Sequence, residues 1–109
     1  MEKRDSAVKR DDGAEFCLVR TYAAGVFAGW VHRAAVKNQS VTVYRARRLW
    51  YWEGAASISQ LATDGPALPE NCKFPCEVEE VDVFQIAEII PCTRKAMEAI
   101  ESVKVWSYE

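Results

Sequence analysis

Two hydrophobic runs and one alternating segment in the first half of the chain predict antiparallel β-structure. The runs, residues 16–22 (FCLVRTY) and 26–36 (VFAGWVHRAAV), are rich in β-branched and aromatic side chains, and small residues at 23–25 separate them. A polar turn at 37–40 leads into residues 41–46 (VTVYRA), in which hydrophobic and polar positions alternate as in the return strand of a hairpin. We therefore expect a meander of about three strands.

The pattern changes in the middle of the chain. Residues 47–52 continue or end the sheet, because aromatic side chains fit a pleated surface. Residues 55–63 then predict a short helix. Ser57 serves as its N-cap, Gln60 completes a capping box three residues later, and Gly65 closes the helix.

The second half contains a loop, strand character and a final helix. Prolines punctuate residues 66–75 as a loop, and residues 76–83 read as a strand with charged alternate positions. Residues 84–90 either continue that strand or form a short helical turn. Thr93 caps a C-terminal helix. An apolar stripe at helical spacing supports it and consists of Ala96, Met97, Ile100 and Val103.

Together these elements predict one α+β domain over residues 15–109. It consists of an antiparallel sheet of about four or five strands, with a short central helix and a C-terminal helix packed on the sheet. Gly29 lies inside a predicted strand and allows another backbone to approach closely. Residues 1–14 carry balanced charge and almost no large apolar side chain, so we expect them to form a flexible charged tail.

Charge and hydropathy bear on whether the protein binds nucleic acid, associates with a membrane or is exported. The net charge of −2 gives no overall attraction to nucleic acid or to an acidic membrane. Basic residues occupy 32–48 without any acid, whereas acidic residues dominate 70–88. These segments pair within one chain, pair between identical chains, or form two solvated faces. There is no apolar run of membrane-span length and no signal-peptide core, so we expect a cytoplasmic protein with reduced cysteines.

Catalytic and metal-binding signatures are weak. His32, the only histidine of the chain, lies in a predicted strand without a local nucleophile signature, and we expect no enzyme activity. Cys72 and Cys76 have a C-x3-C spacing and are weak zinc candidates. Structural zinc sites usually need a second such pair, and the remaining candidates, Cys17, Cys92 and His32, are isolated in predicted strands or caps. We expect no metal and no cofactor.

Residues 45–62 form the best candidate for a ligand or partner site. The candidate binding residues are Arg45, Arg47, Arg48, Trp50, Trp52, Ser57 and Gln60. In an extended strand Arg48, Trp50 and Trp52 share one face, which suits stacking on a base and neutralising a phosphate. The alternative is that the indoles lie in the core or in a subunit interface while the arginines pair with the acidic strand. We expect Trp50 to be buried and Arg48 to act in recognition.

Four segments resemble a family of small phage and prophage proteins that is described as a domain of unknown function. The segments are VRTYAAGVFAG, ARRLWYWEGAASISQLA, PENCKF and AEIIPCT, in this order. The resemblance covers about residues 19–106. It implies a phage or prophage origin and a compact α+β domain, and it brings no established activity. The chain departs from the family pattern at Tyr44-Arg45, where a short "TN" is expected, and in its charged N-terminal extension.

These observations lead to three functional hypotheses. The first is a non-enzymatic phage accessory protein that binds and neutralises a host defence component, either a protein or a nucleotide signal. The second is a nucleic-acid-binding accessory protein, suggested by the basic run from Arg33 to Arg48. The third is a minor virion or assembly component. We also expect a homo-oligomer, because short strands leave sheet edges that association would cover.

Overall fold

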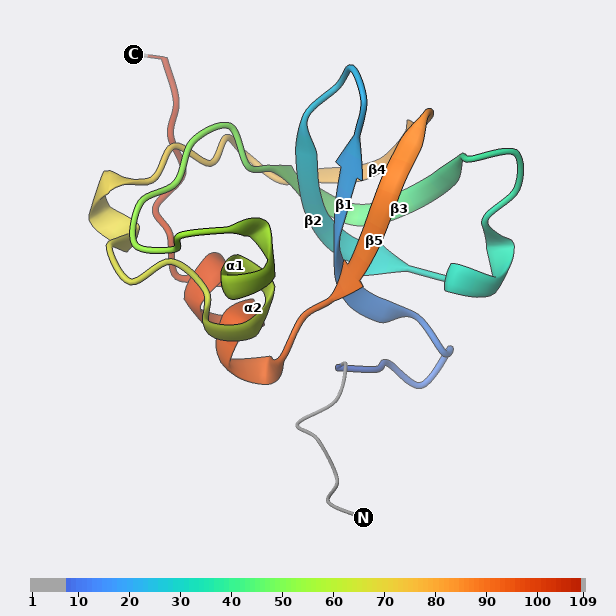
Figure 1. Cartoon of the computed structure of the whole chain (residues 1–109), viewed down its shortest axis with the longest axis horizontal. Coiled ribbons are helices and arrows are strands. Elements are labelled where there is room, and N and C mark those ends of the chain that lie inside the picture. Colours follow the sequence, from blue (N-terminus) through green and yellow to red (C-terminus); the bar gives the residue numbers. More distant parts are fainter. Residues whose placement is uncertain (1–7, 109) are drawn as a thin grey trace.

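The computed structural model describes residues 8–108, and the chain forms an α+β fold (Figure 1). Five strands, two α-helices and two short 3-10 helices follow one another within this range. In chain order they are β1 (Glu15–Thr21), β2 (Val26–Val31), η1 (Arg33–Ala35), β3 (Val41–Arg48), α1 (Ile58–Asp64), η2 (Pro69–Asn71), β4 (Val78–Val83), β5 (Ile86–Pro91) and α2 (Arg94–Glu101).

The five strands form one antiparallel sheet in the order β4-β3-β2-β1-β5. Strands β4 and β5 follow each other in the chain, yet they lie at opposite edges of the sheet. Only Phe84 and Gln85 separate them, and Gln85 adopts a positive φ of 58° at this corner. The sheet therefore curls until its two edges approach each other at this end. Residues 84–90 thus form neither a continuation of β4 nor a helical turn, but a strand at the opposite edge.

The curl creates two apolar cores on the two faces of the sheet. The inner core receives side chains from all five strands and is buried although no helix covers it. Its members are Cys17, Val19, Phe27, Val31, Val41, Val43, Ala46, Val83 and Ile86. The outer core lies between β1, β2 and the helices, which pack side by side on one side of the sheet (Figure 1). Leu18, Leu61, Phe74 and Ile100 are fully buried there.

Turns and caps follow the sequence prediction closely. Asn38 and Gln39 both have positive φ, and backbone bonds join Lys37 and Ser40 in both directions, as in a type I′ hairpin turn. Helix α1 begins after Ser57, whose side chain accepts a bond from the Gln60 backbone N–H, and it ends at Gly65. Thr93 caps α2 in the same way. These predictions are confirmed because each depends on local backbone chemistry alone.

Three element boundaries differ from the prediction. The strand predicted over 26–36 ends at Val31, and a 3-10 turn follows it. The strand predicted from residue 76 begins at Val78. Residues 8–14 belong to the predicted flexible tail but form a turn against β1, in which Val8 is buried and accepts a backbone bond from Phe16. Backbone bonds between Arg10 and Ala14 and from Gly13 to Arg10, together with the buried side chain of Val8, hold this turn. The rest of the predicted tail, residues 1–7, lies outside the described residues.

A bulge in β3 makes the strong curl possible. Ala28 lies opposite Arg47 and Trp30 lies opposite Tyr44, so one extra residue of β3 is accommodated here. Arg45 takes the strained position with φ of 52°. Gly29 of β2 faces the bulge at very close range, because a Cβ built there would lie 2.6 Å from a Val43 methyl carbon and 2.8 Å from the Tyr44 carbonyl oxygen. The expected close backbone approach at Gly29 is confirmed.

Replacing Gly29 by valine should disrupt this contact. We expect Gly29→Val to lower the free energy of unfolding by about 3 kcal/mol or more, since a branched side chain has no space beside the bulge. Gly25→Ala is the control. A Cβ at Gly25 meets no atom within 4 Å, and the positive φ should cost only about 1 kcal/mol. Urea denaturation of both variants measures the difference, and equal losses would contradict the packing argument.

Candidate partner-binding surface

The three arginines of the predicted site lie in three different environments, and Arg47 is the buried one. Its side chain is 8% exposed and points from the end of β3 into the outer core. The guanidinium donates to four backbone carbonyls at 2.7–3.1 Å, those of Phe74, Pro75, Ile100 and Val103. Burial lowers the pKa of this guanidinium from its usual value. Arg47 therefore joins β3 to the loop before β4 and to the end of α2, and it is not free to meet a ligand.

Arg45 and Arg48 are exposed, but each has a partner within the fold. Arg45 forms an ion pair with Glu77 at 2.6 Å, so for this arginine the structure shows pairing within one chain, one of the alternatives that the sequence left open. Arg48 donates to the carbonyl of Ala24 at 2.6 Å and covers the ring of Phe27, 4.4 Å from its centroid. Arg48 thus fastens the β1–β2 loop. Both guanidinium groups keep solvent-facing surface for further contacts.

Ser57 and Gln60 act as helix caps in the structure. The Ser57 hydroxyl accepts from the Gln60 backbone N–H at 3.1 Å, and the Gln60 side chain accepts from the Ala56 N–H at 2.7 Å. Trp52 is half-buried against the outer core. These three candidate residues therefore make contacts that hold the local structure together.

Trp50 is 60% exposed, so the expectation that it is buried is wrong. Strand β3 ends at Arg48, and the chain then turns Leu49 inward, where it is only 2% exposed. The alternation of buried and exposed residues continues from Arg47 to Trp50, so Trp50 falls on the exposed side with Arg48, and it ends at Tyr51, which is also exposed. The Trp50 indole stacks instead on Trp106 from the C-terminal segment, with ring centroids 5.3 Å apart and an interplanar angle of 5°.

Four residues from three segments that are distant in sequence form what we call the aromatic patch, namely Trp50, Tyr51, Lys73 and Trp106. The Lys73 ammonium lies 5.4–5.8 Å from the centroids of all three rings. Tyr51 is 42% exposed and Trp106 is 46% exposed. Backbone bonds between Tyr51 and Lys73, and from the Trp106 N–H to the Phe74 carbonyl, fix the relative positions of the three segments. The patch is thus an ordered surface of large aromatic side chains.

The rim of the patch is polar and internally bonded. The Tyr51 hydroxyl donates to a Glu53 carboxylate oxygen at 2.5 Å, and the amide of Asn71 donates to the other oxygen at 3.0 Å. The bond to Glu53 raises the pKa of Tyr51, and the same bond lowers the pKa of Glu53. Tyr51 therefore stays neutral at physiological pH and presents its ring in a fixed orientation.

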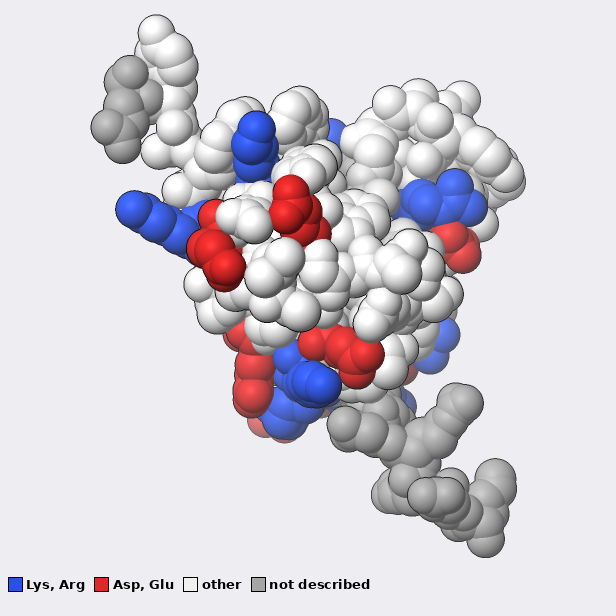
Figure 2. Space-filling view, turned by 60° about the vertical axis from the view of Figure 1, so that its left-hand side comes forward, with Lys and Arg blue, Asp and Glu red and all other residues white. Residues whose placement is uncertain are grey.

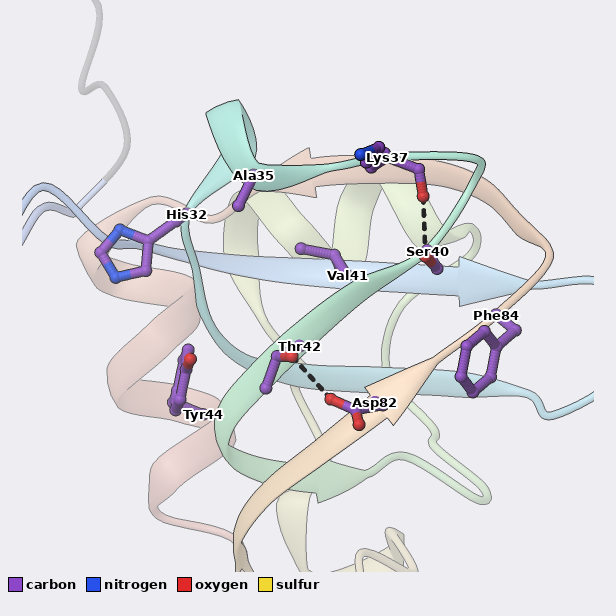
Figure 3. A pocket seen from close by; sticks show the side chains of 9 residues that line it. All are labelled: His32, Ala35, Lys37, Ser40, Val41, Thr42, Tyr44, Asp82 and Phe84. Atoms are coloured by element: carbon purple, nitrogen blue, oxygen red, sulfur yellow. Dashed lines mark hydrogen bonds between the residues drawn. The ribbon is translucent and has the colours of Figure 1, made fainter.

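A second surface lies on the outer face of β3 (Figure 3). It is an open groove of about 340 Å³ between the η1 turn and the β3–β4 ladder. His32 and Tyr44 lie at one end with their rings edge to face, and Phe84 lies at the other end. In the middle the Thr42 hydroxyl donates to Asp82 at 2.6 Å. His32 lies away from this pair in Figure 3.

The cysteines are free thiols in separate environments. Burial raises the pKa of Cys17 and of Cys92 to about 12, so neither forms a thiolate at neutral pH. The Cys72 thiol is buried and faces the Leu68 carbonyl at 3.5 Å, whereas Cys76 is exposed. Within residues 8–108, no group of three or more His, Cys, Asp and Glu side chains is arranged to hold a metal ion.

Surface charge is mixed in sign. In Figure 2, which brings forward the side that is on the left in Figure 1, Lys and Arg side chains are interspersed with Asp and Glu, and no broad area carries one sign. This face therefore lacks the continuous basic surface that binds a nucleic-acid backbone.

In the described part of the chain, no helix is long and apolar enough to cross a membrane.

The sequence prediction included one residue of the aromatic patch and missed the other three. Trp50 was a candidate, but Tyr51, Lys73 and Trp106 were not among the candidate site residues. Trp106 packs against Trp50. The available signal was Trp106 itself, a large aromatic residue that lies beyond the apolar stripe of the C-terminal helix.

Removing the Arg47 donors should destabilise the fold. We expect Arg47→Met to lower the free energy of unfolding by about 3 kcal/mol or more, because four carbonyls lose their buried donor. Arg48→Met is the matched control and should cost about 1 kcal/mol or less, because its single bond is exposed. Thermal and urea melts of both proteins test this, and a greater loss for the Arg48 variant would refute the structural role of Arg47.

Comparison with known families identifies the chain. The family described as "Domain of unknown function (DUF6948)" matches residues 14–100, and the chain belongs to this family. No curated protein matches the sequence, and no solved structure matches the fold.

Proposed function

We propose that this DUF6948 protein is a non-enzymatic accessory protein of a phage or prophage that binds and neutralises a host defence protein through the aromatic patch. The observation that carries the proposal is the stack of Trp50 on Trp106, two large rings that the fold leaves about half exposed. The phage setting and the defence target rest on the resemblance of the four sequence segments described above.

The composition of the patch is typical of a binding hot spot. Tryptophan and tyrosine dominate the binding energy of many interfaces, since each ring buries a large area while losing little conformational freedom. Here the rings are already ordered, because Trp50 and Trp106 stack on each other and Tyr51 is bonded to Glu53. A partner would therefore meet a preorganised surface, which reduces the entropic cost of association.

The same geometry favours a protein partner over a nucleic acid. Each indole already uses one face for the other, which leaves less free ring surface for a stacked base. Arg47 is buried, and Arg45 and Arg48 are engaged within the fold. A single ammonium, that of Lys73, lies at the centre of the patch. An apolar recess rimmed by carboxylates on the partner would complement this arrangement.

Substitutions in the patch test the proposal directly. Trp50→Ala and Trp106→Ala should each reduce capture of the partner from host lysate by at least about tenfold, because a hot-spot truncation costs about 2 kcal/mol or more. Each should cost about 1 kcal/mol of stability, since the rings are largely exposed. Tyr22→Ala removes an even more exposed aromatic from the β1–β2 loop and serves as the control. Quantitative mass spectrometry of the captured proteins, together with thermal melts, provides the measurement. Unchanged capture by both tryptophan variants would refute the proposal.

Two further measurements separate the other partners that the patch could accept. Light scattering at tens of micromolar reports whether copies of this chain associate, and a mass that falls to that of a monomer in Trp50→Ala would make the patch an interface between copies. Native mass spectrometry of protein purified from the host detects a retained nucleotide. Binding of nucleic acid would weaken steeply with rising salt, whereas binding by an aromatic hot spot should not.

A further inference from the structure

Strand β4 is an open edge of the sheet. Within residues 8–108 it pairs with β3 on one side, and no described strand lies on its other side. The outward backbone groups of an edge strand are free to bond to an extended chain. We propose that the β4 edge binds an extended, basic segment of a partner protein, which adds to the sheet as a sixth strand.

The side chains of β4 specify the charge of this segment. Glu79, Glu80 and Asp82 are exposed, and none of them has a Lys or Arg partner among residues 8–108. Glu77 differs because it pairs with Arg45. Three carboxylates within four residues therefore face solvent on both sides of the strand. Lysine or arginine at alternate positions of an added strand would lie directly beside them.

The outer face of β3 and β4 extends the site beyond the edge itself. Glu80 lies opposite Tyr44, and Asp82 lies opposite Thr42. Asp82 and Phe84 form one wall of the groove in Figure 3. Phe84 is 65% exposed at the end of the strand. A long cationic side chain can therefore cross Asp82 into the groove while its methylene groups contact Phe84.

The other sheet edge provides an internal comparison. Strand β5 carries a single acidic side chain, Glu88, and Arg20 of the neighbouring strand already pairs with it at 2.5 Å. Pro91 ends β5 and lacks the N–H that an added strand would need. Free carboxylates are therefore a property of β4 and not of both edges.

The same charges disfavour pairing between two copies of this chain. An antiparallel β4–β4 contact would bring the Glu79, Glu80 and Asp82 carboxylates of the two copies close together, and like charges on paired strands are destabilising. The edge thus rejects its own copies and accepts a strand of opposite charge. This selectivity is why we choose a basic partner segment over a second copy as the occupant.

A titration with a defined peptide tests the proposal. The probe is a capped peptide of alternating threonine and lysine, and the matched control peptide has glutamate in place of each lysine. The ¹⁵N-labelled full-length protein should bind the lysine peptide. Amide hydrogen exchange along β4 should slow at least about tenfold at saturation, because new backbone bonds protect these groups. The glutamate peptide should not bind.

Charge variants locate the contact. Glu80→Lys combined with Asp82→Lys should weaken binding of the lysine peptide at least about tenfold, whereas Glu98→Lys with Glu101→Lys on α2, an equal charge change elsewhere, should weaken it less than about threefold. Glu80→Gln with Asp82→Asn repeats the test if the double lysine variant does not fold. Trp50→Ala should bind the peptide normally, which keeps this result separate from the proposed function. Absence of binding, or binding without slower exchange in β4, would overturn the proposal.

Discussion

The buried guanidinium of Arg47 is the group on which the second half of the structure depends. It supplies donors to carbonyls of the Phe74–Pro75 loop and of the end of α2, which lie far apart in the sequence. A buried carbonyl without a donor is costly, so this one side chain makes the three segments converge. Phe74 then pairs with Val105, and the chain continues to Trp106. Arg47 thus holds the Phe74 loop and the segment after α2 together, and from this segment Trp106 reaches Trp50.

The curl of the sheet is the second constraint, and it separates the surfaces available for function. The two-residue β4–β5 corner and the bulge opposite Gly29 bend five short strands around an inner core. The helices then need to cover only the outer face of β1 and β2. As a result β4 remains an open acidic edge, while the aromatic patch forms where the chain leaves β3. The two surfaces differ in chemistry and suit partners of different kinds.

Local chemistry made most of the fold predictable. The α+β class, the hairpin turn at 37–40, both helix caps and the close approach at Gly29 follow from side-chain pattern, capping residues and the absence of a Cβ. The sequence also offered basic–acidic pairing within the chain as one alternative, and Arg45 and Glu77 form such a pair. Each of these features depends on a few neighbouring residues or on charge alone, so the sequence carries enough information to state it.

Long-range packing decided the remainder. Alternation places Arg47 and Arg48 on opposite faces, but only the path of the C-terminal segment determines which arginine meets buried carbonyls and which meets solvent. The same holds for Trp50, which the pattern assigns to a strand that has already ended. The sequence shows that large aromatic side chains are present at positions 50 and 106. Only the tertiary structure stacks them, because these residues become neighbours after loop, sheet and helix have packed together.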